Sequence, residues 1–157
     1  MGNKIASGSL LRRSYTGLLV AICCLIVGGT AMAQNKRAAK EKINFTDEKW
    51  AEVLKLAKQK GQAIFVDAYA SWCGPCKDLK EQTFTNAKVA AYFNAHFINV
   101  SLDMEKGEGL RLADQFAVDS YPTLLFIDDS GQILRKSEGF LDAGQLLELA
   151  EKVKVKK

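Results

Sequence analysis

Two cysteines separated by two residues form the chemically most informative motif of the chain. Cys73 and Cys76 enclose Gly74-Pro75 and directly follow Trp72. A pair at this spacing can close a small disulfide ring and reopen it, or it can supply two thiolate ligands to a metal. Because a bridge across so short a loop removes little entropy from the unfolded chain, stabilisation is a poor explanation for the pair.

The residues on either side of the cysteines predict a strand followed by a helix. Residues 63–69 are a short apolar run, and a helix of about residues 75–82 would begin with proline, which suits the first helical position. Cys73 would then lie at a helix N-terminus, where free backbone N–H groups and the helix dipole favour a thiolate. We therefore expect Cys73 to be the accessible, attacking thiol and Cys76 to be the less exposed, resolving thiol.

Asp67 is the one carboxylate inside this apolar run. If the strand is buried, desolvation raises the pKa of Asp67 and lets the group exchange protons near neutral pH. Beneath the cysteine turn, Asp67 could take the proton of Cys76. The alternative is a hydrated aspartate at the edge of the sheet.

The remaining periodicities predict one α/β domain. A short edge strand at 43–45, a helix starting at Thr46-Asp47-Glu48 and ending at Gly61, and a helix around 87–93 capped by Thr85 or Asn86 surround the central motif. Further strands are expected at 97–103, 123–127 and 132–136, with a helix after Gly109 and a last helix from Asp142, where Gln145 completes a capping box. This order indicates a central mixed sheet with helices on both faces and a C-terminal hairpin plus helix.

The formal net charge of +4 is concentrated in the first 33 residues. Residues 1–33 carry three basic residues and no acid, so the other 124 residues hold 19 Lys and Arg against 18 Asp and Glu, a balance of +1. A domain with that balance has no general reason to bind phosphate backbones, and we expect no nucleic-acid partner.

Residues 1–33 have the features of a secretory signal peptide. A basic segment with Arg12-Arg13 precedes the apolar core 18–27, and Ala31-Met32-Ala33 places small residues for cleavage before Gln34. The alternative is an uncleaved membrane tether over residues 17–33, which is at the short limit for spanning a bilayer. Residues 34–42 are expected to be a flexible linker.

Removal of the leader takes away two of the four cysteines, Cys23 and Cys24, and leaves Cys73 and Cys76 as the only thiols. A structural zinc site needs four ligands, and His96 is the only histidine, so we expect no metal site and no cofactor. A thiol-based copper carrier and a non-catalytic, chaperone-like binding module are the alternatives to redox exchange.

Trp72-Cys73-Gly74-Pro75-Cys76-Lys77, with Asp67 upstream and Tyr121-Pro122-Thr123 downstream, resembles the thioredoxin family over residues 43–155. The resemblance implies a thioredoxin fold, Cys73 as nucleophile, Cys76 as resolving thiol and Asp67 as a buried proton carrier. It also implies a client-binding surface of Trp72, Gly74, Pro75, Tyr121 and Pro122, with Pro122 in cis and the Tyr121 backbone free to pair with a bound peptide.

The details are most similar to exported members, including the domain that ends the transmembrane disulfide reductase. The resemblance therefore implies a periplasmic monomer that exchanges with protein disulfides and takes electrons from a membrane-embedded thiol donor. Gly74-Pro75 is typical of reducing members, which favours the reducing direction. One departure is notable: cytoplasmic thioredoxins carry a lysine on the strand beside the buried aspartate, whereas 97–103 has none and Asn99 is near the expected position.

Overall fold

The computed structural model describes residues 41–154, so the predicted signal peptide and nearly all of the predicted linker lie outside the described residues. The elements in chain order are α2 (Trp50–Lys60), β1 (Ala63–Tyr69), α3 (Gly74–Asp78), the π-helical turn η1 (Leu79–Thr83), α4 (Ala87–His96), β2 (Phe97–Asp103), α5 (Glu108–Gln115), β3 (Thr123–Ile127), β4 (Ile133–Glu138) and α6 (Ala143–Glu151). No helix among the described residues is both long enough and apolar enough to cross a bilayer.

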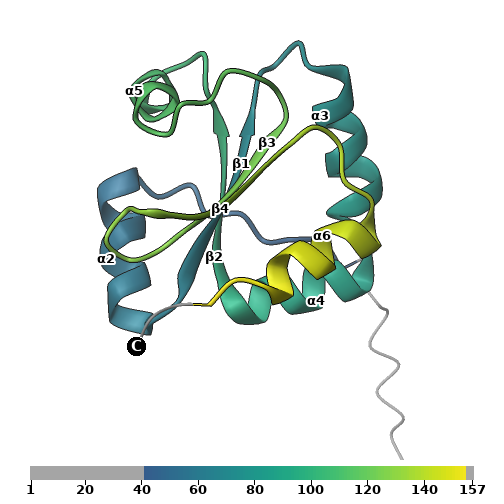
Figure 1. Cartoon of the computed structure of the whole chain (residues 1–157), viewed down its shortest axis with the longest axis horizontal. Helices are drawn as coiled ribbons and strands as arrows, with labels where there is room; N and C mark the ends of the chain where they lie inside the picture. Colours follow the sequence, from purple (N-terminus) through teal and green to yellow (C-terminus); the bar gives the residue numbers. More distant parts are fainter. Residues whose placement is uncertain (1–40, 155–157) are drawn as a thin grey trace, which may run out of the picture. The chain divides into compact units, whose positions relative to one another are not determined.

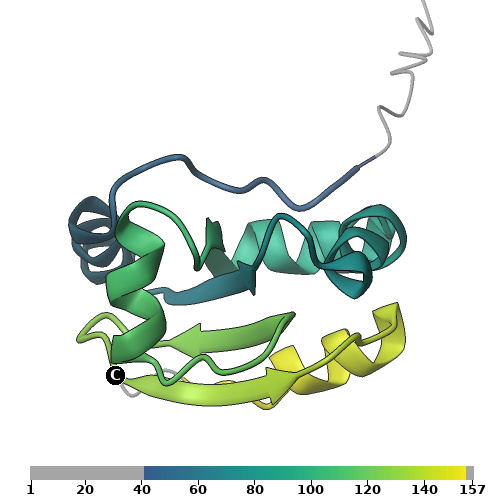
Figure 2. The same ribbon diagram turned by 90° about the horizontal axis from the view of Figure 1, so that it is seen from above.

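The four strands form one mixed sheet in the order β2-β1-β3-β4. β1 runs parallel to β2 and antiparallel to β3, and β3 and β4 form the predicted hairpin. Helices cover both faces of the sheet (Figures 1 and 2). The predicted α/β architecture is therefore confirmed.

The alternation of side chains along β1 divides the interior into two cores. Ile64, Val66 and Ala68 point to the face covered by α2 and α5, and Trp50 of α2 belongs to this core, as expected. Ala63 and Phe65 point to the opposite face, which is covered by α4, α6 and the buried side of the helix after the cysteines. Residue 67 is two positions after Phe65, so its side chain points to the same face of the sheet and lies beneath the helix that follows the cysteines.

The face that holds residue 67 is rich in aromatic contacts. Phe65 packs edge-on against Phe93 of α4, with ring centroids 4.7 Å apart, and lies 5.2 Å from Phe126 of β3. Phe65, Phe93 and Phe126 are completely buried. This rigid cluster fixes β1 against the helices and thereby fixes the depth at which residue 67 is held.

Two local predictions near the N-terminus are wrong. No strand forms at 43–45; instead, Thr46 makes a single parallel bridge to Val100 at the edge of β2. Helix α2 starts at Trp50, because the Thr46 hydroxyl accepts only the Glu48 N–H in a local turn and Lys49 becomes the N-cap. A local side-chain turn has here replaced the predicted first turn of helix.

Three other predicted helix ends are confirmed, whereas α5 starts at Glu108, before the predicted start after Gly109. Gly61 closes α2 in the left-handed conformation, at φ 62°, and Asn86 rather than Thr85 caps α4 by accepting from Lys88 and Val89. Asp142 and Gln145 form the full capping box of α6. Each of these helix ends is decided by backbone groups no more than four residues away, so a local sequence pattern is enough to predict it.

Candidate active site

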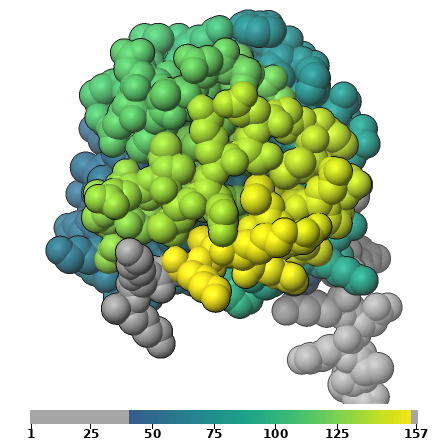
Figure 3. Space-filling model, in the orientation of Figure 1, coloured from purple at the N-terminus to yellow at the C-terminus, as the bar shows by residue number. Residues whose placement is uncertain are grey.

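Three segments meet at one end of the sheet. The cysteine turn follows β1, the 104–107 loop follows β2, and Tyr121-Pro122 precedes β3. Tyr69 pairs with Asp103 across β1 and β2, and Ala68 pairs with Thr123 across β1 and β3, so the three segments are neighbours. This end of the sheet lies at the top of Figure 1 and at the upper rim of the space-filling view in Figure 3.

Cys73 and Cys76 form a disulfide with their Cα atoms 5.4 Å apart. Cys73 is the N-cap of α3, and its Sγ accepts a hydrogen bond from the Cys76 backbone N–H at 3.1 Å. Pro75 occupies the first turn, where a missing N–H costs nothing. In the reduced protein the same backbone donor and the helix dipole would stabilise a thiolate on Cys73.

The expected difference in accessibility between the two cysteines is not found in the oxidised protein. Cys73 is 2% exposed and Cys76 is 1% exposed, because Ala70 and the aromatic rings of Tyr69 and Tyr121 pack against the bridge. The predicted order of attack therefore depends on the helix-cap position of Cys73 rather than on exposure in this state.

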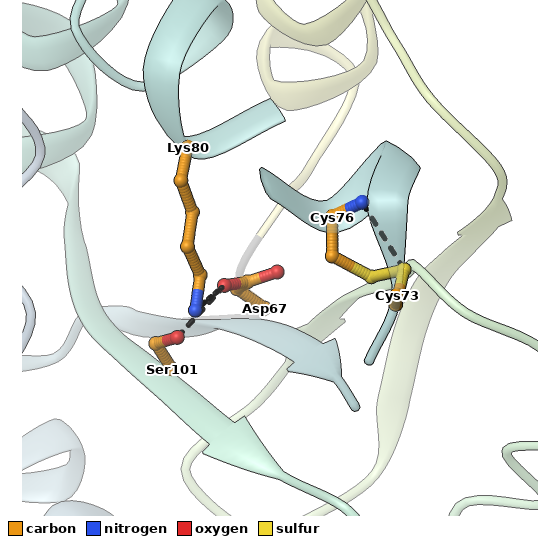
Figure 4. Close-up of polar contacts among 5 residues, drawn as sticks. All are labelled: Asp67, Cys73, Cys76, Lys80 and Ser101. Carbon is orange, nitrogen blue, oxygen red and sulfur yellow. Dashed lines mark hydrogen bonds and ion pairs between the residues drawn. A yellow bond between two sulfur atoms is a disulfide. The ribbon is translucent and has the colours of Figure 1, made fainter. Parts of the chain in front are cut away.

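Asp67 is completely buried, which confirms the expectation of a buried carboxylate and rejects the hydrated alternative. Its Oδ2 accepts the Ser101 hydroxyl at 2.7 Å and lies 3.5 Å from Lys80 Nζ (Figure 4). Its Oδ1 is buried and has no hydrogen-bond partner in the described structure. Figure 4 shows this second oxygen extending toward the side of the two cysteines.

Burial raises the pKa of Asp67, because desolvation disfavours the ionised carboxylate. The positive charge of Lys80 and the hydrogen bond from Ser101 act in the opposite direction and reduce the shift. Burial and the two polar partners therefore shift the Asp67 pKa in opposite directions. One carboxyl oxygen, on the side of the disulfide, has no hydrogen-bond partner in the described structure.

Strand β2 carries no lysine, as the sequence shows, but Asp67 has a lysine neighbour from another element, and the expected position of Asn99 near Asp67 is wrong. Asn99 pairs with Phe65, two residues from the Asp67 position, and its amide nitrogen donates to the Phe93 carbonyl at 3.3 Å; the β2 residue opposite Asp67 is Ser101. The cation comes instead from η1, because Lys80 reaches over the Tyr69 ring, 3.2 Å from its centroid.

Lys80 and Ser101 are thus the site residues that sequence reasoning missed. One signal was available, since Lys80 follows Cys76 by four residues and so shares its helix face. That periodicity does not reveal that this helix face points at Asp67. To predict this contact, one must know which β1 residue lies under the helix. For Ser101, the register of β2 against β1 had to be known.

The predicted client-binding residues also lie at this end of the sheet. The Tyr121–Pro122 peptide bond is cis, as the family resemblance implies. Trp72 is 68% exposed and packs edge-on against Tyr121, with ring centroids 5.9 Å apart. Gly74 and Pro75 are exposed on the first turn of α3, whereas Pro122 is buried.

A family model described as a thioredoxin-like domain matches residues 50–154, which is more than half of the chain. The chain belongs to the thioredoxin family. A redox-active cysteine pair at the start of a helix, next to a cis-proline segment, is the site of a thiol–disulfide oxidoreductase, and the family assignment agrees with this chemistry.

Curated relatives point to the same chemistry. The chain is 36% identical over 97 residues to the thiol:disulfide interchange protein DsbD of Actinobacillus pleuropneumoniae, covering 59% of this chain and 16% of that protein. For DsbD of Haemophilus ducreyi the identity is 34% over 122 residues, covering 75% of this chain and 21% of the relative. The chain therefore spans about a fifth or less of the length of these relatives.

Solved structures of similar chains share the fold. A candidate disulphide isomerase from Bacteroides thetaiotaomicron has a TM-score of 0.63 and 44% identity, covering 74% of this chain and 94% of that one. The C-terminal domain of DsbD from Neisseria meningitidis has a TM-score of 0.57 at 20% identity, covering 66% of this chain and 91% of that one, and supports the fold alone.

The Lys80–Asp67 contact makes a testable prediction. Replacing Lys80 with methionine removes the positive charge that lowers the Asp67 pKa, so this pKa should rise further. Carboxyl-carbon NMR titration of the oxidised protein measures it directly. Lys77→Met is the matched control, because Lys77 is exposed on α3, which directly precedes η1, and it should leave the titration unchanged. Equal midpoints in the two variants would contradict the assigned contact.

Proposed function

We propose that this protein is a thiol–disulfide oxidoreductase that reduces disulfides of client proteins in an exported compartment. The observation that carries the proposal is the Cys73–Cys76 disulfide at the N-terminus of α3, with the buried Asp67 beneath it. The Gly74-Pro75 pair between the cysteines favours the reducing direction, since reducing thioredoxins carry the same pair.

In the reduced protein, the Cys73 thiolate attacks one sulfur of the client disulfide, and the second client sulfur leaves as a thiolate that takes a proton from solvent. Cys76, deprotonated, then attacks Cys73 Sγ, and the first client sulfur leaves and is protonated. The client gains two electrons and two protons, and the protein is left with the Cys73–Cys76 disulfide seen here.

Asp67 is the group placed to accept the Cys76 proton during the second step. Its unpaired Oδ1 lies on the cysteine side, while Ser101 and Lys80 hold Oδ2. Lys80 and Ser101 also line a pocket of about 260 Å³, and 36% of the Lys80 side chain is exposed. This pocket gives the far side of the carboxylate a route by which its proton can exchange with solvent.

The proposed location and donor depend on the leader and the relatives. Residues 1–33 have the composition of a signal peptide cleaved before Gln34, or of an uncleaved tether at 17–33, followed by a linker to the domain at 43–157. DsbD is a thiol:disulfide interchange protein, and the likeness to it supports a membrane-embedded thiol donor for this chain. We propose a periplasmic monomer that this donor keeps reduced.

Reduction of insulin by dithiothreitol, followed as turbidity, tests the proposed activity. Wild-type protein should accelerate precipitation, and Cys73→Ser should return it to the uncatalysed rate. A wild-type protein that gives only the uncatalysed rate would favour the chaperone-like binding module instead.

A further inference from the structure

The loop after β2 places a carboxylate beside the exposed tryptophan of the site. Trp72 Nε1 donates a hydrogen bond to Glu105 Oε2 at 2.9 Å, and the Trp72 ring packs edge-on against Tyr121. We propose that Glu105, together with these two aromatic rings, selects client disulfides that carry a lysine or arginine next to the reacting cysteine. This inference rests on the proposed function and adds a class of substrate to it.

The 104–107 loop holds Glu105 in place through several contacts. The Met104 N–H donates to the Tyr69 carbonyl at 2.8 Å, and the Glu105 N–H donates to Asp103 Oδ1 at 3.1 Å. Met104 itself is buried. A side chain that starts from such an anchored backbone loses little entropy when it binds, which favours recognition by a fixed charge.

The nearest cation in the sequence forms no ion pair with Glu105. Lys106 pairs with Asp103 instead, since its Nζ lies 2.8 Å from Asp103 Oδ2 and donates to Ser71 Oγ at 3.1 Å. Among residues 41–154, Glu105 Oε1 has no recorded hydrogen-bond or ion-pair partner, and the residue is exposed. A client cation can therefore reach a free carboxylate oxygen.

The negative charge of Glu105 acts on the surface beside the cis-proline. Burial first, and then the negative charges of Glu105 and Asp103, raise the pKa of Tyr121. Tyr121 is half-buried and lies next to the disulfide, so the same field acts on a client held there. The surface formed by Glu105, Trp72 and Tyr121 can bind an ammonium or guanidinium group. The carboxylate attracts the cation, and the exposed face of Trp72 can bind it by a cation–π contact.

The proposal can be tested with three disulfide-bonded peptides. They differ only in the residue next to the cysteine, which is lysine in one peptide, glutamine in the second and glutamate in the third. With wild-type protein, the second-order rate constant of reduction should be about 3- to 10-fold higher for the lysine peptide than for the glutamate peptide at low ionic strength. The ratio should decrease as salt is added, because a rim charge is screened.

Glu105→Gln is the decisive variant, since its side-chain carbonyl can still accept the Trp72 indole hydrogen bond while the charge is lost. The lysine-to-glutamate ratio should fall close to 1, and the Trp72 indole N–H resonance should stay in place. Glu151→Gln, an exposed charge change at the end of α6, should keep the wild-type ratio.

The outcomes separate this inference from the proposed function. If wild-type protein reduces all three peptides at equal rates, or if Glu105→Gln keeps the wild-type ratio, the inference is overturned while the oxidoreductase activity stands. If wild-type protein reduces none of the peptides, the proposed function itself fails and the inference fails with it.

Discussion

Cys76→Ser should accumulate mixed disulfides with client proteins, whereas wild-type protein should show almost none. Without the Cys76 thiol, Cys73 still attacks a client disulfide, but no internal thiol displaces the client. The Cys73 position supports attack, since the backbone N–H that would stabilise its thiolate belongs to residue 76 and remains in the serine variant. Non-reducing electrophoresis of the affinity-purified variant measures the trapped species.

The matched control is Cys73→Ser, which keeps the resolving thiol and removes the attacking one. This variant should trap no clients in the same preparation. If Cys73→Ser traps clients and Cys76→Ser does not, the two roles are reversed, and the helix-cap argument for Cys73 is wrong. Clients trapped by Cys76→Ser also show whether lysine and arginine are common beside the reacting cysteine.

Asp67→Asn should slow the resolution of a preformed mixed disulfide by about 100-fold at neutral pH, at the lower end of what a positioned general base contributes. The amide is similar in size to the carboxyl group, so packing should be kept, but it cannot accept the Cys76 proton. Stopped-flow release of a chromophoric thiol from Cys73 measures the step. Asp47→Asn, at an exposed position, should resolve at the wild-type rate.

The same substitution should make the oxidised protein more stable at high pH. Burial raises the pKa of Asp67 in the folded state, so between the unfolded and folded pKa values the folded protein binds more protons and loses stability as pH rises. Asp67→Asn removes this penalty and should add about 1–3 kcal/mol to the free energy of unfolding at pH 8.

This gain in stability should fade as pH falls toward the unfolded pKa, because the carboxyl group is then neutral in both states. Urea denaturation of the wild-type and Asp67→Asn proteins at pH 8 and at pH 3.5 measures the difference. Equal stabilities at both pH values would contradict a desolvated carboxylate at this position.

Much of the fold could be predicted because its determinants are local. The apolar run 63–69, the capping box at Asp142 and the left-handed glycine at position 61 each depend on a few neighbouring residues. Thr46 shows the limit even at short range, since a hydroxyl that could cap a helix formed a tight turn with Glu48 instead.

The environment of Asp67 could not be predicted in full, because it joins three elements. Its burial follows from the apolar run around it, but its partners come from Ser101 on β2 and Lys80 on η1. The register of β1 against β2 decides that Ser101 rather than Asn99 faces the carboxylate. The spacing of Lys80 from Cys76 indicates a shared helix face but not a contact with Asp67, and the neighbouring strand carries no lysine.

The reduction potential of the Cys73–Cys76 pair decides whether the protein reduces client disulfides. Purified protein is equilibrated with glutathione and dithiothreitol redox buffers, and the reduced fraction is read by thiol alkylation. We expect a potential near that of thioredoxin, about −270 mV, as a protein that reduces client disulfides requires. A value near about −120 mV would mark a strong oxidant and would contradict it.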